Sequence, residues 1–206
     1  KDYFLAIRDK GITSVFFDDF LDLNCFADVI INGLIDTENA AYKAKHTLLG
    51  TSNLVLGSEY LNYLPQISTD DSKFRIAVTT GGIDHYDLSS KLIELVNGLE
   101  GSIKLHIIVG EYFDNVKNIE ECADNSIHDV SLHFQPEGIS EIVGCCDLSI
   151  SAGGITVYEL AALGVATIGI SLWENQRRNI EGLGKRRVLL PLIYKTGVDF
   201  ADELSE

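Results

Sequence analysis

The stretch Ser149-Ile-Ser-Ala-Gly-Gly-Ile-Thr-Val-Tyr-Glu-Leu160 decides the fold and raises the first question about function. It begins with an apolar strand pattern and ends with a helix pattern, and two adjacent glycines stand at the junction. Glycine weakens the interior of both strands and helices through backbone entropy, so a pair at this position requires a structural reason. A tight turn is one such reason, and a ligand that presses against the bare backbone is another.

The alternation of strand and helix extends along the chain from about Phe74 onward. Strands are predicted at residues 74–80, 103–109, 129–134, 147–151 and 167–171, and helices from about residue 87 and at 115–122, 136–143, 155–163 and 175–183. Continuous apolar strands between amphipathic helices indicate a parallel sheet that is covered on both faces. The predicted fold class is therefore α/β, with a Rossmann-like parallel sheet flanked by helices.

The chain is expected to divide into three parts. Residues 1–35 contain two further strand candidates, at 13–17 and 29–31, and are interpreted as the end of an N-terminal α/β domain. Residues 36–72 are more polar and are predicted to contain a linker. Residues 73–206 form the predicted C-terminal Rossmann-like domain.

The charge excludes some partners. Sixteen basic residues against 31 acidic ones give a formal net charge of -15, which repels nucleic acids and anionic lipid surfaces. A nucleotide is not excluded, because helix N-termini and glycine turns bind phosphate without lysine. The longest apolar runs are too short to cross a bilayer, and no secretion signal is evident, so we expect a cytoplasmic protein without membrane insertion.

Cysteine and histidine spacing gives no sign of a metal site. The four cysteines form no Cys-x-x-Cys pair, and the five histidines share no metal-ligand spacing. We expect thiols in a reducing cytoplasm, no metal and no other cofactor.

Two double glycines, Gly81-Gly82 and Gly153-Gly154, follow predicted strands at the edge where parallel α/β folds bind ligands. At such a turn a ligand can approach the backbone, and the amides of the next helix point at an anion. Neither turn matches the dinucleotide fingerprint or the P-loop. One double glycine alone is as well explained by a plain turn, but two at the same edge favour a ligand.

Polar side chains near these turns could contact such a ligand. Thr156 lies in the first turn of the helix, and Glu159 could accept two hydrogen bonds from the vicinal hydroxyls of a ribose. Asn175 and Gln176, at the start of the next helix, could bind sugar hydroxyls. The alternatives are that Glu159 is an ordinary solvated glutamate and that Asn175 only caps its helix.

The block from Ser151 to Gly164, followed by Glu174-Asn-Gln176, resembles the C-terminal domain of GT-B nucleotide-sugar enzymes. Within them it is most similar to the group of the pseudaminic acid pathway UDP-sugar hydrolase and spore-coat polysaccharide biosynthesis protein G. The lipid II-forming N-acetylglucosaminyltransferase is a more distant match. Val78-Thr-Thr-Gly-Gly-Ile-Asp84 is similar to the first C-domain loop of this group, and Phe17-Asp-Asp-Phe20 to the end of its N-domain.

The resemblance implies the C-terminal half of a GT-B architecture with UDP or a UDP-sugar as partner. It implies contacts with the substrate at Gly81, Gly82, Gly153, Gly154, Ile155, Thr156, Glu159, Asn175 and Gln176. The glycines and Thr156 would line the diphosphate, Glu159 would hold the uridine ribose, and Asn175 and Gln176 would face the sugar. Asn175 is also a candidate catalytic residue.

The sequence departs from the group in two places. Ala166 stands where the group usually has proline. The G-x-G-H loop, whose histidine is implicated in catalysis, does not occur, and His46 and His85 stand in a different context. The chain is therefore either a fragment of an enzyme or a protein that binds without catalysing.

Three functions remain open from the sequence. The first expectation is a hydrolase that releases UDP from a 2,4-diacetamido-type sugar in surface polysaccharide or nonulosonic acid biosynthesis. The alternatives are an inverting glycosyltransferase with a UDP-sugar donor and a non-catalytic nucleotide-sugar-binding module. The sequence does not specify the sugar, the acceptor or the oligomeric state.

Overall fold

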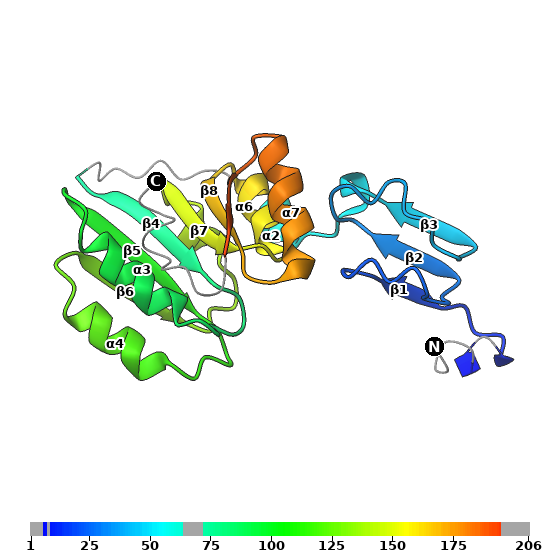
Figure 1. Ribbon diagram of the computed structural model, residues 1–206, viewed down its shortest axis with the longest axis horizontal. Coiled ribbons are helices and arrows are strands. Elements are labelled where there is room, and N and C mark those ends of the chain that lie inside the picture. Colours follow the sequence, from blue (N-terminus) through cyan, green and yellow to red (C-terminus); the bar gives the residue numbers. More distant parts are fainter. Residues whose placement is uncertain (1–5, 8, 64–71, 195–206) are drawn as a thin grey trace. The chain divides into compact units, whose positions relative to one another are not determined.

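The computed structural model describes residues 6–7, 9–63 and 72–194 of the 206-residue chain. The chain divides into two compact units, residues 1–56 and 57–206 (Figure 1). Each unit has its own parallel sheet.

The first unit contains a three-stranded parallel sheet. Its strands are β1 (Val15–Phe17), β2 (Val29–Asn32) and β3 (His46–Leu49), in the order β1-β2-β3, followed by the 3-10 helix η1 (Thr51–Asn53). Both strand candidates predicted in the first 35 residues are present as β1 and β2. The strand β3 and the helix η1 lie inside the polar range where we expected a linker.

Asp18, from the segment that resembles the end of an N-domain, shapes the turn after β1. Its buried carboxylate accepts hydrogen bonds from the backbone N–H groups of Phe20 (2.8 Å) and Asp22 (2.7 Å) and from the Tyr42 hydroxyl (2.6 Å). A buried carboxylate with three donors is fully used by the fold, so Asp18 has a structural role.

The second unit contains a six-stranded parallel sheet with the order β6-β5-β4-β7-β8-β9. The strands are β4 (Phe74–Thr79), β5 (Ile103–Val109), β6 (Asp129–Phe134), β7 (Leu148–Ala152), β8 (Ala166–Ser171) and β9 (Leu190–Ile193). The helices are α2 (Ser58–Leu61), α3 (Leu88–Val96), α4 (Val116–Asp124), α5 (Ser140–Val143), α6 (Thr156–Leu163) and α7 (Glu174–Lys185). The predicted Rossmann-like sheet is confirmed.

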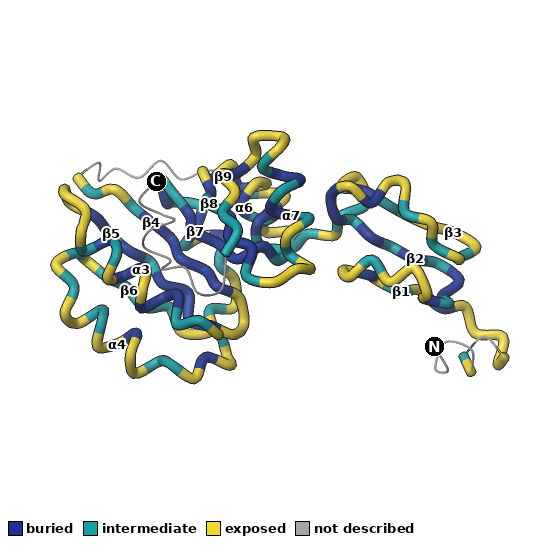
Figure 2. Tube along the Cα trace, viewed as in Figure 1, coloured by how far each residue is buried: buried dark blue, intermediate teal, exposed yellow. Residues whose placement is uncertain are grey.

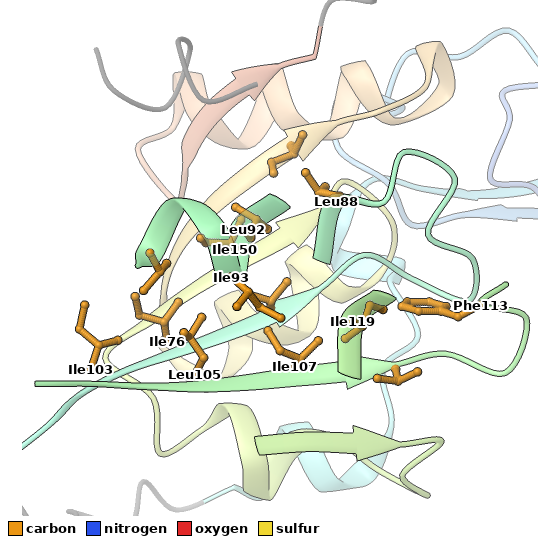
Figure 3. Packing of buried hydrophobic residues seen from close by; sticks show 14 residues of the cluster. Ile76, Leu88, Leu92, Ile93, Ile103, Leu105, Ile107, Phe113, Ile119 and Ile150 are labelled. Atoms are coloured by element: carbon orange, nitrogen blue, oxygen red, sulfur yellow. The ribbon is translucent and has the colours of Figure 1, made fainter. Parts of the chain in front are cut away.

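Continuous burial at the end of β4, over residues 76–79, shows that this sheet is covered on both faces (Figure 2). Ile76 and Val78 point into a core that α3 and α4 cover, whereas Ala77 points into a second core with α2 and α6. The first core is the larger, and Figure 3 shows Leu92 and Ile93 of α3 among its strand residues. Burial of apolar side chains on both faces holds the sheet between its helices.

One prediction for this unit needs correction, and one strand was not predicted. A helix was predicted for residues 136–143, but α5 begins at Ser140. Gly138 weakens a helix at its position, and Gln135 has a positive φ of 43° at the end of β6, so the chain turns before it enters the helix. The strand β9 was not predicted. No helix within the described ranges is long and apolar enough to span a membrane.

Candidate functional site

Strand pairing brings the two double glycines to one edge of the second unit's sheet. β4 and β7 are parallel neighbours, and Thr79 is paired with Ser151. Gly81 and Gly153 each follow two residues after these partners. Both turns therefore leave the sheet side by side, at the carboxyl ends of adjacent strands.

The Gly81-Gly82 turn contacts neighbouring backbone on one side and has free space at its Cα atoms on another. Gly81 has a φ of 97°, which residues with a Cβ rarely adopt, and a Cβ on Gly81 or Gly82 would meet no atom within 4 Å. The next turn along the sheet approaches closely, since a Cβ on Gly110 would lie 2.6 Å from the Gly81 carbonyl oxygen. The backbone N–H of Tyr112 also donates a hydrogen bond to the Gly82 carbonyl oxygen (3.1 Å). Neighbouring backbone thus fixes a turn whose glycine Cα atoms face open space.

The two glycines of the second turn have different roles. A Cβ on Gly153 would lie 2.6 Å from Cγ1 of Ile180 and 3.0 Å from Cβ of Gln176, so α7 can pack here only against a glycine. Nδ2 of Asn179 also donates a hydrogen bond to the Gly153 carbonyl (3.0 Å). A Cβ on Gly154 would meet nothing within 4 Å. Packing therefore explains Gly153, whereas the space beside Gly154 remains open to a ligand.

The helix α6 begins directly after this turn, and no side chain in the described part of the chain caps it. Ile155 is its N-cap residue and forms no side-chain hydrogen bond to the first turn. The first amides of a helix carry partial positive charge and need acceptors. An anion at the N-terminus of α6 would supply these acceptors, and the adjacent Gly154 leaves room for it.

Glu159 is half-buried, so it is not the solvated helix residue of the alternative hypothesis. Burial raises the pKa of its carboxyl above the ordinary value of 4.5, hydrogen bonds with Thr156 and Tyr60 oppose this rise, and nearby Glu59 adds to it. Burial and the negative charge of Glu159 raise the pKa of the Tyr60 hydroxyl to about 12. A carboxylate has about four acceptor positions, so two remain for ligand hydroxyls.

Thr156, in the first turn of α6, forms a hydrogen bond with the Glu159 carboxylate. A hydroxyl in that position can orient this carboxylate. Its place near the amides that would hold a phosphate stays a prediction.

Asn175 is not the residue that caps α7, contrary to the alternative considered from the sequence. The N-cap residue of α7 is Trp173, and Oε1 of Gln176 accepts a hydrogen bond from the backbone N–H of Leu172 (3.0 Å). Asn175 is exposed, and its side chain forms no hydrogen bond with any part of the chain that the structure describes. The Asn175 amide and the Gln176 NH₂ group are thus available to a ligand.

Three features of this edge were not predicted from the sequence. Asp84 is buried, and its carboxylate accepts hydrogen bonds from the backbone N–H groups of Leu88 and Ser89 (2.9 Å each). Asp84 therefore caps α3. An aspartate shortly before an apolar helix could have indicated this cap. The Thr80 hydroxyl, just before Gly81, is buried without a hydrogen-bond partner among the described residues.

The third missed feature is an aromatic cluster, formed by His85, Tyr86, Trp173 and Tyr194. No sequence pattern links these residues, because they come from three separate segments.

No protein-family model matches this sequence. An uncharacterized protein of Methanocaldococcus jannaschii is 23% identical over 190 residues, which cover 86% of this chain and 39% of that protein. The chain thus spans about two fifths of the curated relative that it matches.

Solved structures share the fold. The structure of MurG from Acinetobacter baumannii superposes with a TM-score of 0.68 at 19% identity, covering 97% of this chain and 58% of that one. The spinosyn rhamnosyltransferase SpnG, solved in complex with thymidine diphosphate, gives a TM-score of 0.51 at 13% identity, covering 93% of this chain and 62% of that one. These neighbours are GT-B glycosyltransferases, which confirms the GT-B part of the expected resemblance. The second unit is the Rossmann-like α/β half of a GT-B architecture.

Proposed function

We propose that the second unit binds a nucleoside diphosphate sugar at the carboxyl edge of its sheet. The observation that supports this most is the pairing of an open glycine turn with the uncapped N-terminus of α6. The diphosphate would lie at Gly154, Ile155 and the first amides of α6, with Gly81 and Gly82 beside it. Backbone amides and the helix dipole would supply positive potential in a chain whose net charge is -15.

The other predicted residues fit around this position as parts of the same proposal. Glu159 would accept hydrogen bonds from the ribose hydroxyls, with Thr156 and Tyr60 orienting its carboxylate. Asn175 and Gln176 would bind the sugar. UDP is the nucleotide that the sequence resemblance implies, and a fold neighbour was solved with another nucleoside diphosphate.

We propose glycosyl transfer as the reaction of the whole protein. The expected hydrolase group has no support among the compared structures, whereas their fold neighbours are glycosyltransferases. During transfer the leaving nucleoside diphosphate gains negative charge, which the amides of α6 and of the glycine turns would stabilise. The acceptor hydroxyl and its base would come from residues or molecules other than those at this edge of the sheet.

Thermal melting in the presence of ligands tests the binding proposal. A ligand that binds only the native state raises the melting temperature. UDP is expected to raise it more than uridine or inorganic phosphate alone, because only UDP joins the ribose and diphosphate contacts. The absence of any shift at millimolar UDP would refute the proposal.

Product analysis then separates transfer from hydrolysis. Strict dependence of UDP release on an added acceptor supports transfer. Release of free sugar and UDP without an acceptor would support hydrolysis and contradict glycosyl transfer.

A further inference from the structure

Three ring contacts hold the aromatic cluster together. The Trp173 ring meets His85 edge-on, with centroids 5.4 Å apart and planes at 84°, and it lies 5.7 Å from Tyr86. The Tyr86 ring continues the cluster to Tyr194, with centroids 4.8 Å apart. Edge-to-face and tilted aromatic pairs of this kind are favourable, so the contacts with His85 and Tyr86 restrict the motion of the indole.

The position of the cluster links both glycine turns. His85 and Tyr86 follow Gly81-Gly82 in the loop between β4 and α3, whereas Trp173 follows β8. The strand β7 lies between β4 and β8 in the sheet, so the ring contacts cross the carboxyl end of β7. The Gly153-Gly154 turn starts at that same end. The cluster therefore borders the proposed diphosphate position.

The start of α7 places the indole beside the second turn. Trp173 is the N-cap residue of α7, and Gln176, three residues later, is the residue whose Cβ approaches Gly153. Trp173 is nevertheless 45% exposed. A large ring that is held by its neighbours and still exposed offers a binding surface that loses little conformational entropy when a ligand covers it.

The chemistry around the indole is that of a carbohydrate subsite. One face of a pyranose ring carries several C–H groups that stack on an aromatic ring, while its hydroxyls need hydrogen-bond partners. The exposed Asn175 amide and the Gln176 NH₂ group lie at the same helix start as Trp173. An aromatic ring beside two side-chain amides offers a stacking surface for the C–H face of a sugar and hydrogen-bond partners for its hydroxyls.

The sheet separates this cluster from the proposed ribose site. Tyr194 packs against the core that α3 and α4 cover, whereas Tyr60, the partner of Glu159, belongs to the core on the opposite face. A diphosphate at the edge between the faces would extend its nucleoside towards Glu159 and its sugar towards Trp173. This arrangement favours a sugar ring over a nucleobase at the indole.

We infer that the aromatic cluster is the sugar subsite of the proposed nucleotide-sugar site. The pyranose ring stacks on Trp173, His85 and Tyr86 hold the indole, and Asn175 and Gln176 bind the sugar hydroxyls. This inference rests on the proposed function, because it assigns the sugar part of the same ligand.

Trp173 is the only tryptophan of the chain, so indole fluorescence reports on this residue alone. The chain is titrated with UDP, UDP-glucose, UDP-N-acetylglucosamine and UDP-N-acetylgalactosamine. At least one UDP-sugar is expected to change the indole emission more than UDP does. Equal changes with UDP and all three UDP-sugars, or no change with any of them, would overturn the inference.

Calorimetry with variants supplies the second readout. Trp173→Ala is expected to weaken binding of that UDP-sugar by roughly two- to tenfold, the range of an aromatic contact, and to leave UDP affinity unchanged. Trp173→Phe keeps a ring and should retain part of the affinity. Phe134→Ala is the matched control, because Phe134 is an exposed aromatic residue at the end of the outermost strand β6.

The outcomes separate the two proposals. If Trp173→Ala weakens UDP and the UDP-sugar equally, the indole contacts the nucleotide and the sugar subsite is refuted. If the wild-type chain binds UDP but no UDP-sugar more tightly, the sugar subsite alone is refuted. If it binds neither, the proposed function fails together with the inference.

Discussion

The helices α3 and α6 both follow a strand and a double glycine, yet their N-termini differ. At α3 the Asp84 carboxylate accepts hydrogen bonds from Leu88 and Ser89, so the chain itself supplies an anion. At α6 no side chain of the described residues caps the first turn, and Gly154 faces open space. Similar sequence patterns thus give one closed and one open anion position. This difference is the reason why we propose the diphosphate position at α6, with Gly81-Gly82 beside it.

The largest expected effect is a loss of stability at the N-terminus of α3, where Asp84 is the cap. Asp84→Ala should lower the free energy of unfolding by about 2–4 kcal/mol, because two helix N–H groups lose their acceptor in a buried site. Urea denaturation measures this change. The control Asp114→Ala removes an exposed aspartate near the same edge and should change stability by no more than about 0.5 kcal/mol. Equal stability of the two variants would show that α3 does not depend on its cap.

The second effect separates the two glycines at the open end. Gly153→Ala should cost about 1–3 kcal/mol of stability, because the added Cβ would overlap Ile180 and displace α7. Gly154→Ala adds the same atom to open space and should cost about 0.5 kcal/mol or less. Melting curves of the pair check this difference. Similar losses in both variants would contradict the packing explanation for Gly153.

The third effect concerns ligand binding beside α6. Glu159→Ala should weaken UDP binding by about 1–3 kcal/mol, since a carboxylate that bonds the ribose hydroxyls is lost. Isothermal calorimetry compares it with Glu141→Gln, which changes an exposed glutamate in the first turn of α5. Unchanged UDP affinity in Glu159→Ala would limit Glu159 to its contacts with Thr156 and Tyr60.

The smallest effect is the pH dependence of the same carboxyl. Its pKa is raised in the folded chain, mainly by burial, so the native state binds the proton more tightly than the unfolded state does. Its contribution to stability is therefore fully present below pH 4.5, the ordinary pKa, and decreases as the pH rises through the folded pKa. Glu159→Gln stays neutral, so its stability relative to wild type should increase between pH 4 and pH 7, as measured by urea denaturation at each pH. A constant difference would contradict the raised pKa.

The sequence predicted those features that depend on local pattern. Apolar runs and helical periodicity identified the strands β4 to β8 and the position of both glycine turns, because each depends on residues close together in the chain. The parallel order then placed Gly81 and Gly153 at one edge.

Contacts between distant segments could not be predicted in the same way. The hydrogen bond of Glu159 joins it to Tyr60, which comes from the range expected to be a linker. The aromatic cluster requires Tyr86 and Trp173 to meet across β7, and neither residue has a local signal. The different roles of Gly153 and Gly154 become visible only when α7 packs against one of them.

The central claim is that the glycine turn before α6 binds the diphosphate, and one calorimetric comparison tests it most directly. Gly154→Leu fills the open space at the turn with a side chain, whereas Gly138→Leu fills equally open space between β6 and α5. Gly154→Leu is expected to lose at least about tenfold in UDP affinity, equivalent to about 1.4 kcal/mol, while its melting temperature without ligand stays close to that of Gly138→Leu. Gly138→Leu should bind UDP as the wild type does. Wild-type UDP affinity in a folded Gly154→Leu variant would contradict the account.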